Sequence, residues 1–211
     1  MYGKFEALAE EKRRRIINAT LAEFSAHTFK NASTDKIAAA AEISKGALFE
    51  YFRTKKQLYL YLLDYALNEL VARYDHFWIG TDKDPLNVLQ GLFLLKLEQM
   101  KRYPALYDFL GYAYIRETDP DLVEVIHNHS AALQGKMMRE MLADLDYSRF
   151  RPGLDPQMMM NVVTWTLNGY SDSEMIKLRA SDSDFHDTGE WGKTVDAYFN
   201  LFRTCFYSDT A

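Results

Sequence analysis

The sequence predicts an all-α protein of about nine or ten helices, and three observations support this fold class. Apolar residues recur at helical spacing, for example at Ile17 and Leu21. Asp-Pro pairs stand at residues 84–85, 119–120 and 155–156, and an acidic cap followed by proline is typical of a helix start. No stretch shows the sustained alternation of a β-strand. With 211 residues, 48% of them apolar, the chain can bury a real core as one compact body or as two domains.

The first helix is expected from about Ala9 to His27. Two short helices follow, because Ser33 and Ser44 are good N-cap residues and residues 42–44 interrupt the helical pattern between them. Two short helices joined by a tight turn give the outline of a helix-turn-helix, here over residues 33–52. A long connecting helix is expected from Thr54 to Trp78.

The rest of the chain is expected to be helical as well. Each of the three Asp-Pro pairs opens a helix, and Pro104 ends one helix and starts a short aromatic one. The expected helices cover residues 85–102, 104–117, 121–143, 156–179 and 190–207. We expect a DNA-binding domain at residues 9–69 and a larger domain at residues 70–211.

Charge is divided unevenly along the chain. Residues 1–56 carry 11 Lys and Arg against 7 Asp and Glu, a net charge of +4, and the remaining residues carry 14 against 23, a net charge of −9; the sum is −5. Only the N-terminal part therefore suits an anionic polymer. The basic run at residues 12–15 would by itself fit a solvated helix face, but its place before a helix-turn-helix favours DNA.

Composition also indicates the cellular setting. The single cysteine, Cys205, excludes an internal disulfide, and its aromatic neighbours favour a buried, inert thiol. No apolar run reaches the roughly 18 residues that a membrane helix needs, and the N-terminus lacks the apolar core of a signal peptide. We expect a cytoplasmic protein with no membrane association.

Residues 33–58 resemble the helix-turn-helix motif of the TetR (tetracycline-repressor-like) family of bacterial transcriptional regulators. The positions that match the family pattern are Thr34, Ile37, Ala38, Ala41, Ser44, Gly46, Tyr51, Phe52, Lys55 and Leu58. The chain departs from the pattern at Glu42, Phe49 and Lys56, where glycine, tyrosine and glutamate are usual. The resemblance implies a homodimeric regulator, most often a repressor, that binds a palindromic operator in double-stranded DNA and is released by a small apolar or amphipathic effector.

The resemblance also implies a DNA-contacting set of residues. Thr34, Tyr51 and Lys55 are expected to bind phosphates, because hydroxyl and ammonium groups suit anionic oxygens. Lys45 could donate to guanine or contact a phosphate, and Glu50 could accept from cytosine or repel the backbone. The full set is Thr34, Ser44, Lys45, Gly46, Ala47, Phe49, Glu50, Tyr51 and Lys55.

The C-terminal part is expected to hold the effector and the dimer contacts. Aromatic residues there could be core or could line an apolar pocket with a few polar groups. The pocket set is Phe93, Phe109, Tyr112, Tyr114, Trp165 and Asn168. The last two helices are expected to form the dimer, through one stripe at Val195, Tyr198, Phe199, Phe202 and Phe206 and another at Val162, Trp165, Thr166 and Gly169.

No residue pattern indicates an enzyme, a cofactor or a metal. A glycine-rich phosphate loop, a zinc-protease motif and a nucleophile elbow are all missing from the sequence. His127 and His129 are two residues apart on an expected helix and so point in different directions. The acidic loop at residues 182–187 fits no known ligand spacing. The competing hypothesis, an all-α enzyme or ligand carrier that contains a helix-turn-helix, leaves the charge asymmetry without a cause.

Overall fold

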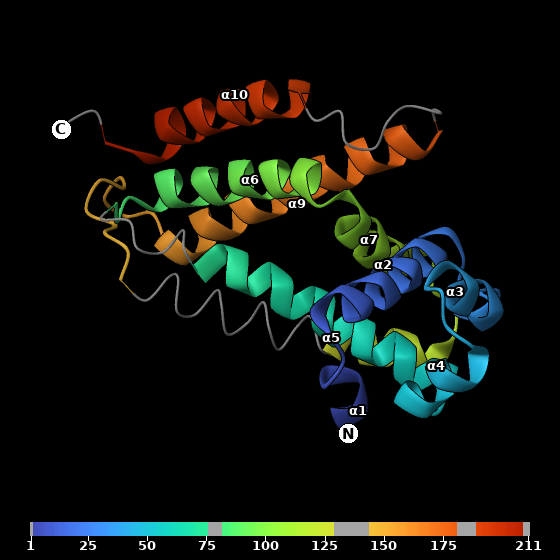
Figure 1. Ribbon diagram of the computed structural model, residues 1–211. Coiled ribbons are helices and arrows are strands. Elements are labelled where there is room, and N and C mark those ends of the chain that lie inside the picture. Colours follow the sequence, from blue (N-terminus) through green and yellow to red (C-terminus); the bar gives the residue numbers. More distant parts are fainter. Residues whose placement is uncertain (1, 76–81, 129–143, 181–188, 209–211) are drawn as a thin grey trace. The chain divides into compact units, whose positions relative to one another are not determined.

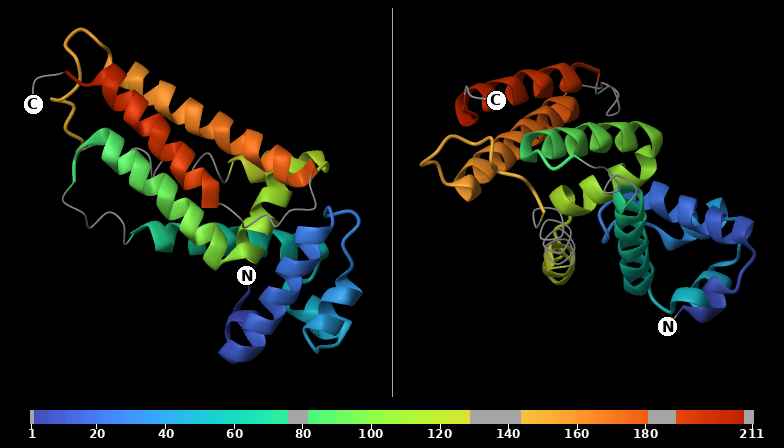
Figure 2. Two further views of the ribbon diagram at one scale, coloured as in Figure 1. Left: turned by 90° about the horizontal axis from the view of Figure 1, so that it is seen from above. Right: turned by 90° about the vertical axis from the view of Figure 1, so that its left-hand side faces the viewer.

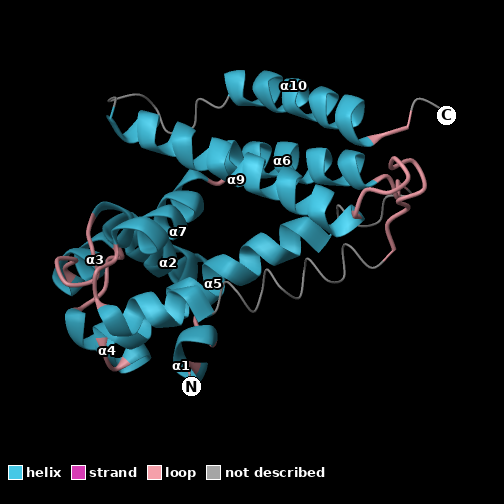
Figure 3. Cartoon of the chain, turned by 180° about the vertical axis from the view of Figure 1, so that it is seen from behind, coloured by secondary structure: helices cyan, strands magenta, loops and turns pink. Residues whose placement is uncertain are grey.

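The computed structural model describes residues 2–75, 82–128, 144–180 and 189–208. In these ranges the chain forms ten helices joined by loops, and the one β-type pairing is an isolated bridge between Phe150 and Tyr207 (Figures 1 and 3). The all-α prediction is therefore confirmed.

The helix bounds follow the sequence closely. They are α1 Gly3–Glu6, α2 Glu10–Ala26, α3 Thr34–Ala40, α4 Lys45–Phe52, α5 Lys55–Asp75, α6 Pro85–Arg102, α7 Pro104–Arg116, α9 Pro156–Ala180 and α10 Gly189–Phe206, with residues 120–128 also helical. The predicted ends of the helices at Trp78 and at residue 143 lie outside the described residues. Only α1 was not expected.

The Asp-Pro starts are confirmed at the level of hydrogen bonds. Asp84 Oδ1 accepts from the backbone N–H groups of Leu86 at 3.1 Å and Asn87 at 3.0 Å. The same cap is made by Asp119 before residue 120 and by Asp155 before α9. Each carboxylate satisfies N–H groups that have no acceptor inside the helix, and its charge suits the helix dipole.

Contacts group the residues into two compact units. Unit 1 consists of residues 1–76 and 103–136, and unit 2 of residues 77–102 and 137–211. Helix α7 therefore packs with the N-terminal helices, although the sequence places it in the C-terminal domain. The functional boundary between residues 69 and 70 stays a prediction, since compactness divides a chain by packing and not by activity.

Unit 1 is built around aromatic contacts between α2, α5 and α7. Phe109 is 0% exposed; its ring centroid lies 5.5 Å from that of Tyr59 and 6.4 Å from that of Phe24. Phe5, also 0% exposed, anchors α1 against Phe52 of α4 at 4.7 Å. The short helices of the helix-turn-helix are thus held by long-range packing, which a bundle of this size needs.

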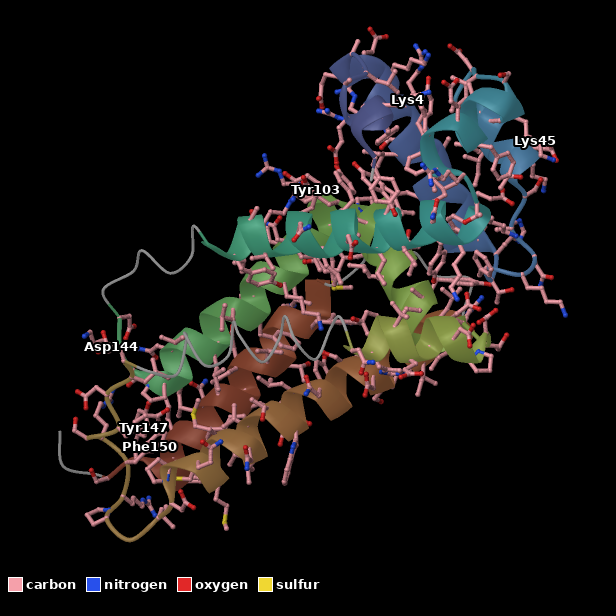
Figure 4. The ribbon with its side chains drawn as sticks, turned by 90° about the horizontal axis from the view of Figure 1, so that it is seen from below. Lys4, Lys45, Tyr103, Asp144, Tyr147 and Phe150 are labelled. Carbon is pink, nitrogen blue, oxygen red and sulfur yellow. The ribbon has the colours of Figure 1, made fainter. Side chains whose placement is uncertain are left out.

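Unit 2 is a layer of α6, α9 and α10, which lie side by side (Figure 2). Its core is formed by one face of each helix, with Phe93, Val163 and Phe199 among the buried residues. At one end, Asp84 accepts from the Tyr207 hydroxyl and from Arg149 Nη1, the latter at 2.7 Å. This carboxylate therefore fixes the start of α6, the end of α10 and the loop at residues 144–155, which carries Tyr147 and Phe150 (Figure 4).

Candidate nucleic-acid interface

Helices α3 and α4 form a capped helix-turn-helix. Ser33 Oγ accepts from the Lys36 N–H at 3.4 Å, and Ser44 Oγ accepts from the Ala47 N–H at 3.1 Å. The buried side chains of Ile37, Leu48 and Phe52 face the core of unit 1. The other side of α4 remains on the surface, as a helix that enters a DNA groove requires.

The turn between the two helices is made by a residue in a left-handed conformation. Glu42 has φ of 55°. Its N–H donates to the Ala39 carbonyl at 3.1 Å, and the Ile43 N–H donates to the Ala38 carbonyl at 3.0 Å. These two bonds close α3 in the pattern in which glycine is preferred, because a Cβ is strained at positive φ. The turn between α3 and α4 is therefore formed with Glu42 in place of the usual glycine, and the backbone is strained at this residue.

Replacing Glu42 by glycine should raise the free energy of unfolding by about 1 kcal/mol, because the backbone strain is removed. The ion pair lost with the carboxylate, 3.8 Å from Arg15 and well exposed, contributes little. Chemical denaturation of Glu42→Gly beside Glu42→Ala measures this effect. Equal stability of the two variants would contradict it, since alanine keeps the Cβ.

The predicted DNA-contacting residues cluster around α4. Ser44, Lys45, Gly46 and Glu50 are exposed, and the rest of that set is partly buried: Thr34, Ala47, Phe49, Tyr51 and Lys55. The ammonium of Lys45 lies 2.8 Å from the Asp35 carboxylate, in a pair exposed enough to open at low cost. Their role in binding DNA stays a prediction.

A cation that the motif does not contain also borders α4. Lys4 Nζ lies 2.6 Å from Glu50 Oε1, and this bond lowers the pKa of the Glu50 carboxyl. Lys45 is the first residue of α4, and Lys4 of α1 lies beside that helix (Figure 4). The sequence did not predict a role for Lys4, because a helix of four residues is too short to show a periodic pattern. The one feature that could have indicated this helix is the apolar Phe5 within a polar N-terminus. Lys4 offsets the charge of Glu50 on the surface that would meet phosphates.

Lys55 is directed into the protein. Its ammonium donates to the carbonyl oxygens of Lys30, at 3.2 Å, and Ala32, and lies 5.0 Å from the centre of the Phe29 ring. Burial lowers the pKa of Lys55, while Glu23 and Glu117 act in the opposite direction. In this structure Lys55 therefore holds the loop between α2 and α3, whereas the sequence predicts a phosphate contact.

Comparison with known proteins identifies this architecture. Residues 16–62, which contain the helix-turn-helix and the first turns of α5, match the family described as bacterial regulatory proteins, tetR family. Over these residues the chain matches the TetR family. It is accordingly a DNA-binding transcriptional regulator.

Two known regulators extend the similarity over most of the chain. The protein named "Probable acrEF/envCD operon repressor" of Escherichia coli (strain K12) is 23% identical over 187 residues, which are 86% of this chain and 84% of that protein. The HTH-type transcriptional regulator RutR of the same strain is 28% identical over 177 residues, 81% of this chain and 78% of RutR. Both are named as regulators of transcription.

A solved structure agrees with the TetR-like fold. NalD, titled the secondary repressor of the MexAB-OprM multidrug efflux pump in Pseudomonas aeruginosa, superposes with a TM-score of 0.65 and 19% identity. The match covers 95% of this chain and 100% of that structure.

The six predicted pocket residues are divided between the two units. Phe109, Tyr112 and Tyr114 are on α7 in unit 1, whereas Phe93, Trp165 and Asn168 are in unit 2. Phe109 is 0% exposed and packs against the rings of Phe24 and Tyr59 in the core of unit 1. Tyr112 lies under the Arg116 guanidinium, and the Tyr114 ring faces His127. A ligand-binding role for the six residues stays a prediction.

The two predicted dimer stripes differ in how far their side chains are exposed. On α10, Val195, Phe199 and Phe202 are buried in the core of unit 2, whereas Tyr198 and Phe206 are partly exposed. A dimer contact through this stripe stays a prediction. The exposed side of that helix instead carries Leu201, Ala197 and Cys205. The thiol is thus exposed and not buried as expected, because the neighbouring aromatic side chains turn to the other side of the helix.

On α9 the predicted stripe is on the surface. Trp165 is 69% exposed, and Val162 and Gly169 are exposed with it. Met158 and Ile176 continue the same line, at spacings that place all five on one side of the helix. One side of α9 is therefore both exposed and largely apolar.

Two further findings concern the described residues only. They contain no group of three or more His, Cys, Asp or Glu side chains arranged to hold a metal ion. Among the same residues, no helix combines the length and hydropathy that crossing a lipid bilayer requires.

Proposed function

We propose that the protein is a homodimeric, ligand-responsive repressor that binds a palindromic operator and acts in the cytoplasm. The observation that carries the proposal is the exposed N-terminal half of α4, where Lys45 and Gly46 follow a Ser44 cap. The first N–H groups of a helix have no acceptor within it and suit phosphate oxygens. Lys45 can add a base contact or a phosphate contact.

The glycine at position 46 supports close approach to DNA, because no contact among the described residues requires a glycine there. A Cβ added there would meet only Ser44 Oγ, at 3.8 Å, which is an ordinary contact. Glycine costs a helix up to about 1 kcal/mol relative to alanine. We infer that this residue serves the approach of the backbone to DNA.

The variant Gly46→Ala should therefore have different effects on the stability of the protein and on its affinity for DNA. We expect the free energy of unfolding to stay equal or rise by up to about 1 kcal/mol. Affinity for operator DNA should fall by about tenfold to a hundredfold, because a methyl group inserted into a close interface costs about 1–3 kcal/mol. Denaturation and fluorescence anisotropy measure the two effects.

The matched control is Gly192→Ala on α10, where an added Cβ would meet Leu94 at 3.8 Å. This change also replaces a helical glycine, but in unit 2 and not on the α4 surface. It should leave DNA affinity unchanged. Undiminished operator binding by Gly46→Ala would contradict the proposed DNA face.

A dimer is supported by the exposed apolar side of α9. A contiguous apolar patch on a soluble protein marks an interaction site. One eight-residue recognition helix reads too few base pairs for useful specificity, and a two-fold dimer that reads two half-sites meets this need. We propose that two copies pair through the exposed sides of α9 and α10.

Control by a ligand follows from the same dimer. Two recognition helices reach successive major grooves only when they are about 34–36 Å apart. A small apolar or amphipathic effector that favours another separation lowers DNA affinity in proportion to that preference, and DNA weakens the effector equally. We propose that the effector binds within residues 70–211 and that α5 carries the signal, since α5 begins at the DNA-binding motif.

The test is a gel shift with the DNA that flanks the protein's own gene, against a shuffled duplex of equal length. Specific retardation supports the proposed function. Equal retardation of both duplexes at physiological salt would contradict it, because charge alone gives binding without sequence preference.

A further inference from the structure

Lys96 is a cation set on the apolar side of a helix. It lies on α6 near the buried residues Phe93, Leu97 and Met100. Its ammonium is 5.9 Å from the centre of the Phe93 ring. Among the residues that the structure describes, no carboxylate lies within 4.0 Å of it. Asp172 on α9 attracts it from farther away, but burial has the larger effect and lowers the pKa of Lys96.

A second polar group on the same helix lacks a partner. Gln99 is 8% exposed, and its buried Oε1 accepts no hydrogen bond from any described residue. Buried polar atoms are nearly always bonded, so an orphaned acceptor needs an explanation. Gln99 is three residues after Lys96, a spacing that places the two side chains next to each other on a helix.

The two groups have complementary chemistry. Lys96 offers hydrogen-bond donors and a positive charge, and Gln99 Oε1 offers an acceptor. Removing a cation from water without a counter-ion is unfavourable, and an anion that arrives beside it restores the lost interaction. Apolar residues on the same helix would surround the rest of such a ligand.

We propose that Lys96 and Gln99 form the polar end of the effector site, and that the effector is an amphipathic hydroxy acid. Its carboxylate pairs with Lys96, a nearby hydroxyl donates to Gln99 Oε1, and its apolar chain packs against the buried side of α6. The proposal rests on the ligand response proposed above and names its chemistry. The simpler role for Lys96 is long-range attraction to Asp172 within unit 2.

Calorimetric titration of the full chain with three matched probes tests the site. The probes are 1-octanol, octanoate and 3-hydroxyoctanoate, each below its aggregation concentration. We expect octanoate to bind about tenfold more tightly than 1-octanol, and 3-hydroxyoctanoate several-fold more tightly again. Lys96→Met should remove the first preference, and Gln99→Leu only the second.

Stability measurements separate this site from a structural role. Lys96→Met should keep or raise the thermal midpoint of the ligand-free protein, since it removes a poorly compensated charge. Asp172→Asn should strengthen octanoate binding by removing a competing anion. A lowered midpoint in Lys96→Met, with octanoate affinity unchanged in both variants, would assign Lys96 to Asp172 and overturn the proposal.

Failure of this site and failure of the proposed function are distinguishable. Equal binding of octanoate and 1-octanol, or no binding of either, overturns the Lys96 site. If 1-octanol still releases the flanking DNA, ligand response stands without that site. If octanoate binds through Lys96 and DNA affinity does not change, the site stands and the proposed ligand response fails.

Discussion

Replacing Phe109 by alanine should lower the free energy of unfolding by about 3–5 kcal/mol. The ring is 0% exposed and lies between Phe24 of α2 and Tyr59 of α5. Its removal leaves a cavity that two rigid aromatic rings cannot close. Chemical denaturation followed by far-UV circular dichroism measures the loss.

The control for this prediction is Ile115→Ala on the same helix. Ile115 is exposed, so its truncation should change the free energy of unfolding by no more than about 0.5 kcal/mol. If Phe109→Ala cost less than about 1 kcal/mol, the residue could not be part of a packed core, and a pocket would again explain it.

The same variant should weaken DNA binding although Phe109 is not on the proposed DNA face. Helix α7 supports the helix-turn-helix through α2, and the Glu117 carboxylate that follows α7 accepts from the Phe29 N–H at 2.9 Å. A looser α7 should therefore also loosen the loop between α2 and α3, to which Lys55 is hydrogen-bonded as well. Partial loss of operator affinity in a folded variant would show that α7 positions the DNA-binding helices.

The helices could be predicted because helix formation depends largely on residues that are close together in the sequence. The carboxylate of Asp84 caps a helix whose residues are adjacent in sequence, and the periodicity of Ile17 and Leu21 depends only on spacing. The partners of a helix are not local. Nothing in the sequence indicates that Phe109 packs on Phe24, 85 positions earlier, so the packing of α7 with the N-terminal helices could not be predicted.

The candidate site was predictable to the same extent. The motif predicted α4 and its Ser44 cap correctly, because capping and turn formation depend on residues that are adjacent in sequence. It did not indicate that Lys55 turns inward, since two carbonyl oxygens of the preceding loop compete for that ammonium. It also did not include Lys4, which reaches Glu50 only once Phe5 is buried.

Replacing Trp165 by arginine should convert the protein from a dimer to a monomer at micromolar concentration. Trp165 is 69% exposed at the middle of the apolar side of α9, where the proposed two-fold axis would bring two copies together. Two arginines facing each other there would be desolvated and would repel. The fold should not change, because an exposed side chain contributes little to its own unit. Analytical ultracentrifugation and circular dichroism measure both properties.

The monomer should also bind palindromic operator DNA about a hundredfold more weakly or worse, since joining two half-site contacts multiplies affinity by about 10² to 10⁴. Gln157→Arg is the matched control, because it adds the same charge to an exposed position on another side of α9. It should remain a dimer with unchanged DNA affinity. A Trp165→Arg variant that stays dimeric would place the dimer contact elsewhere and leave the apolar side of α9 to another partner. Loss of operator binding without dissociation would instead indicate that Trp165 acts on the separation of the recognition helices within an intact dimer.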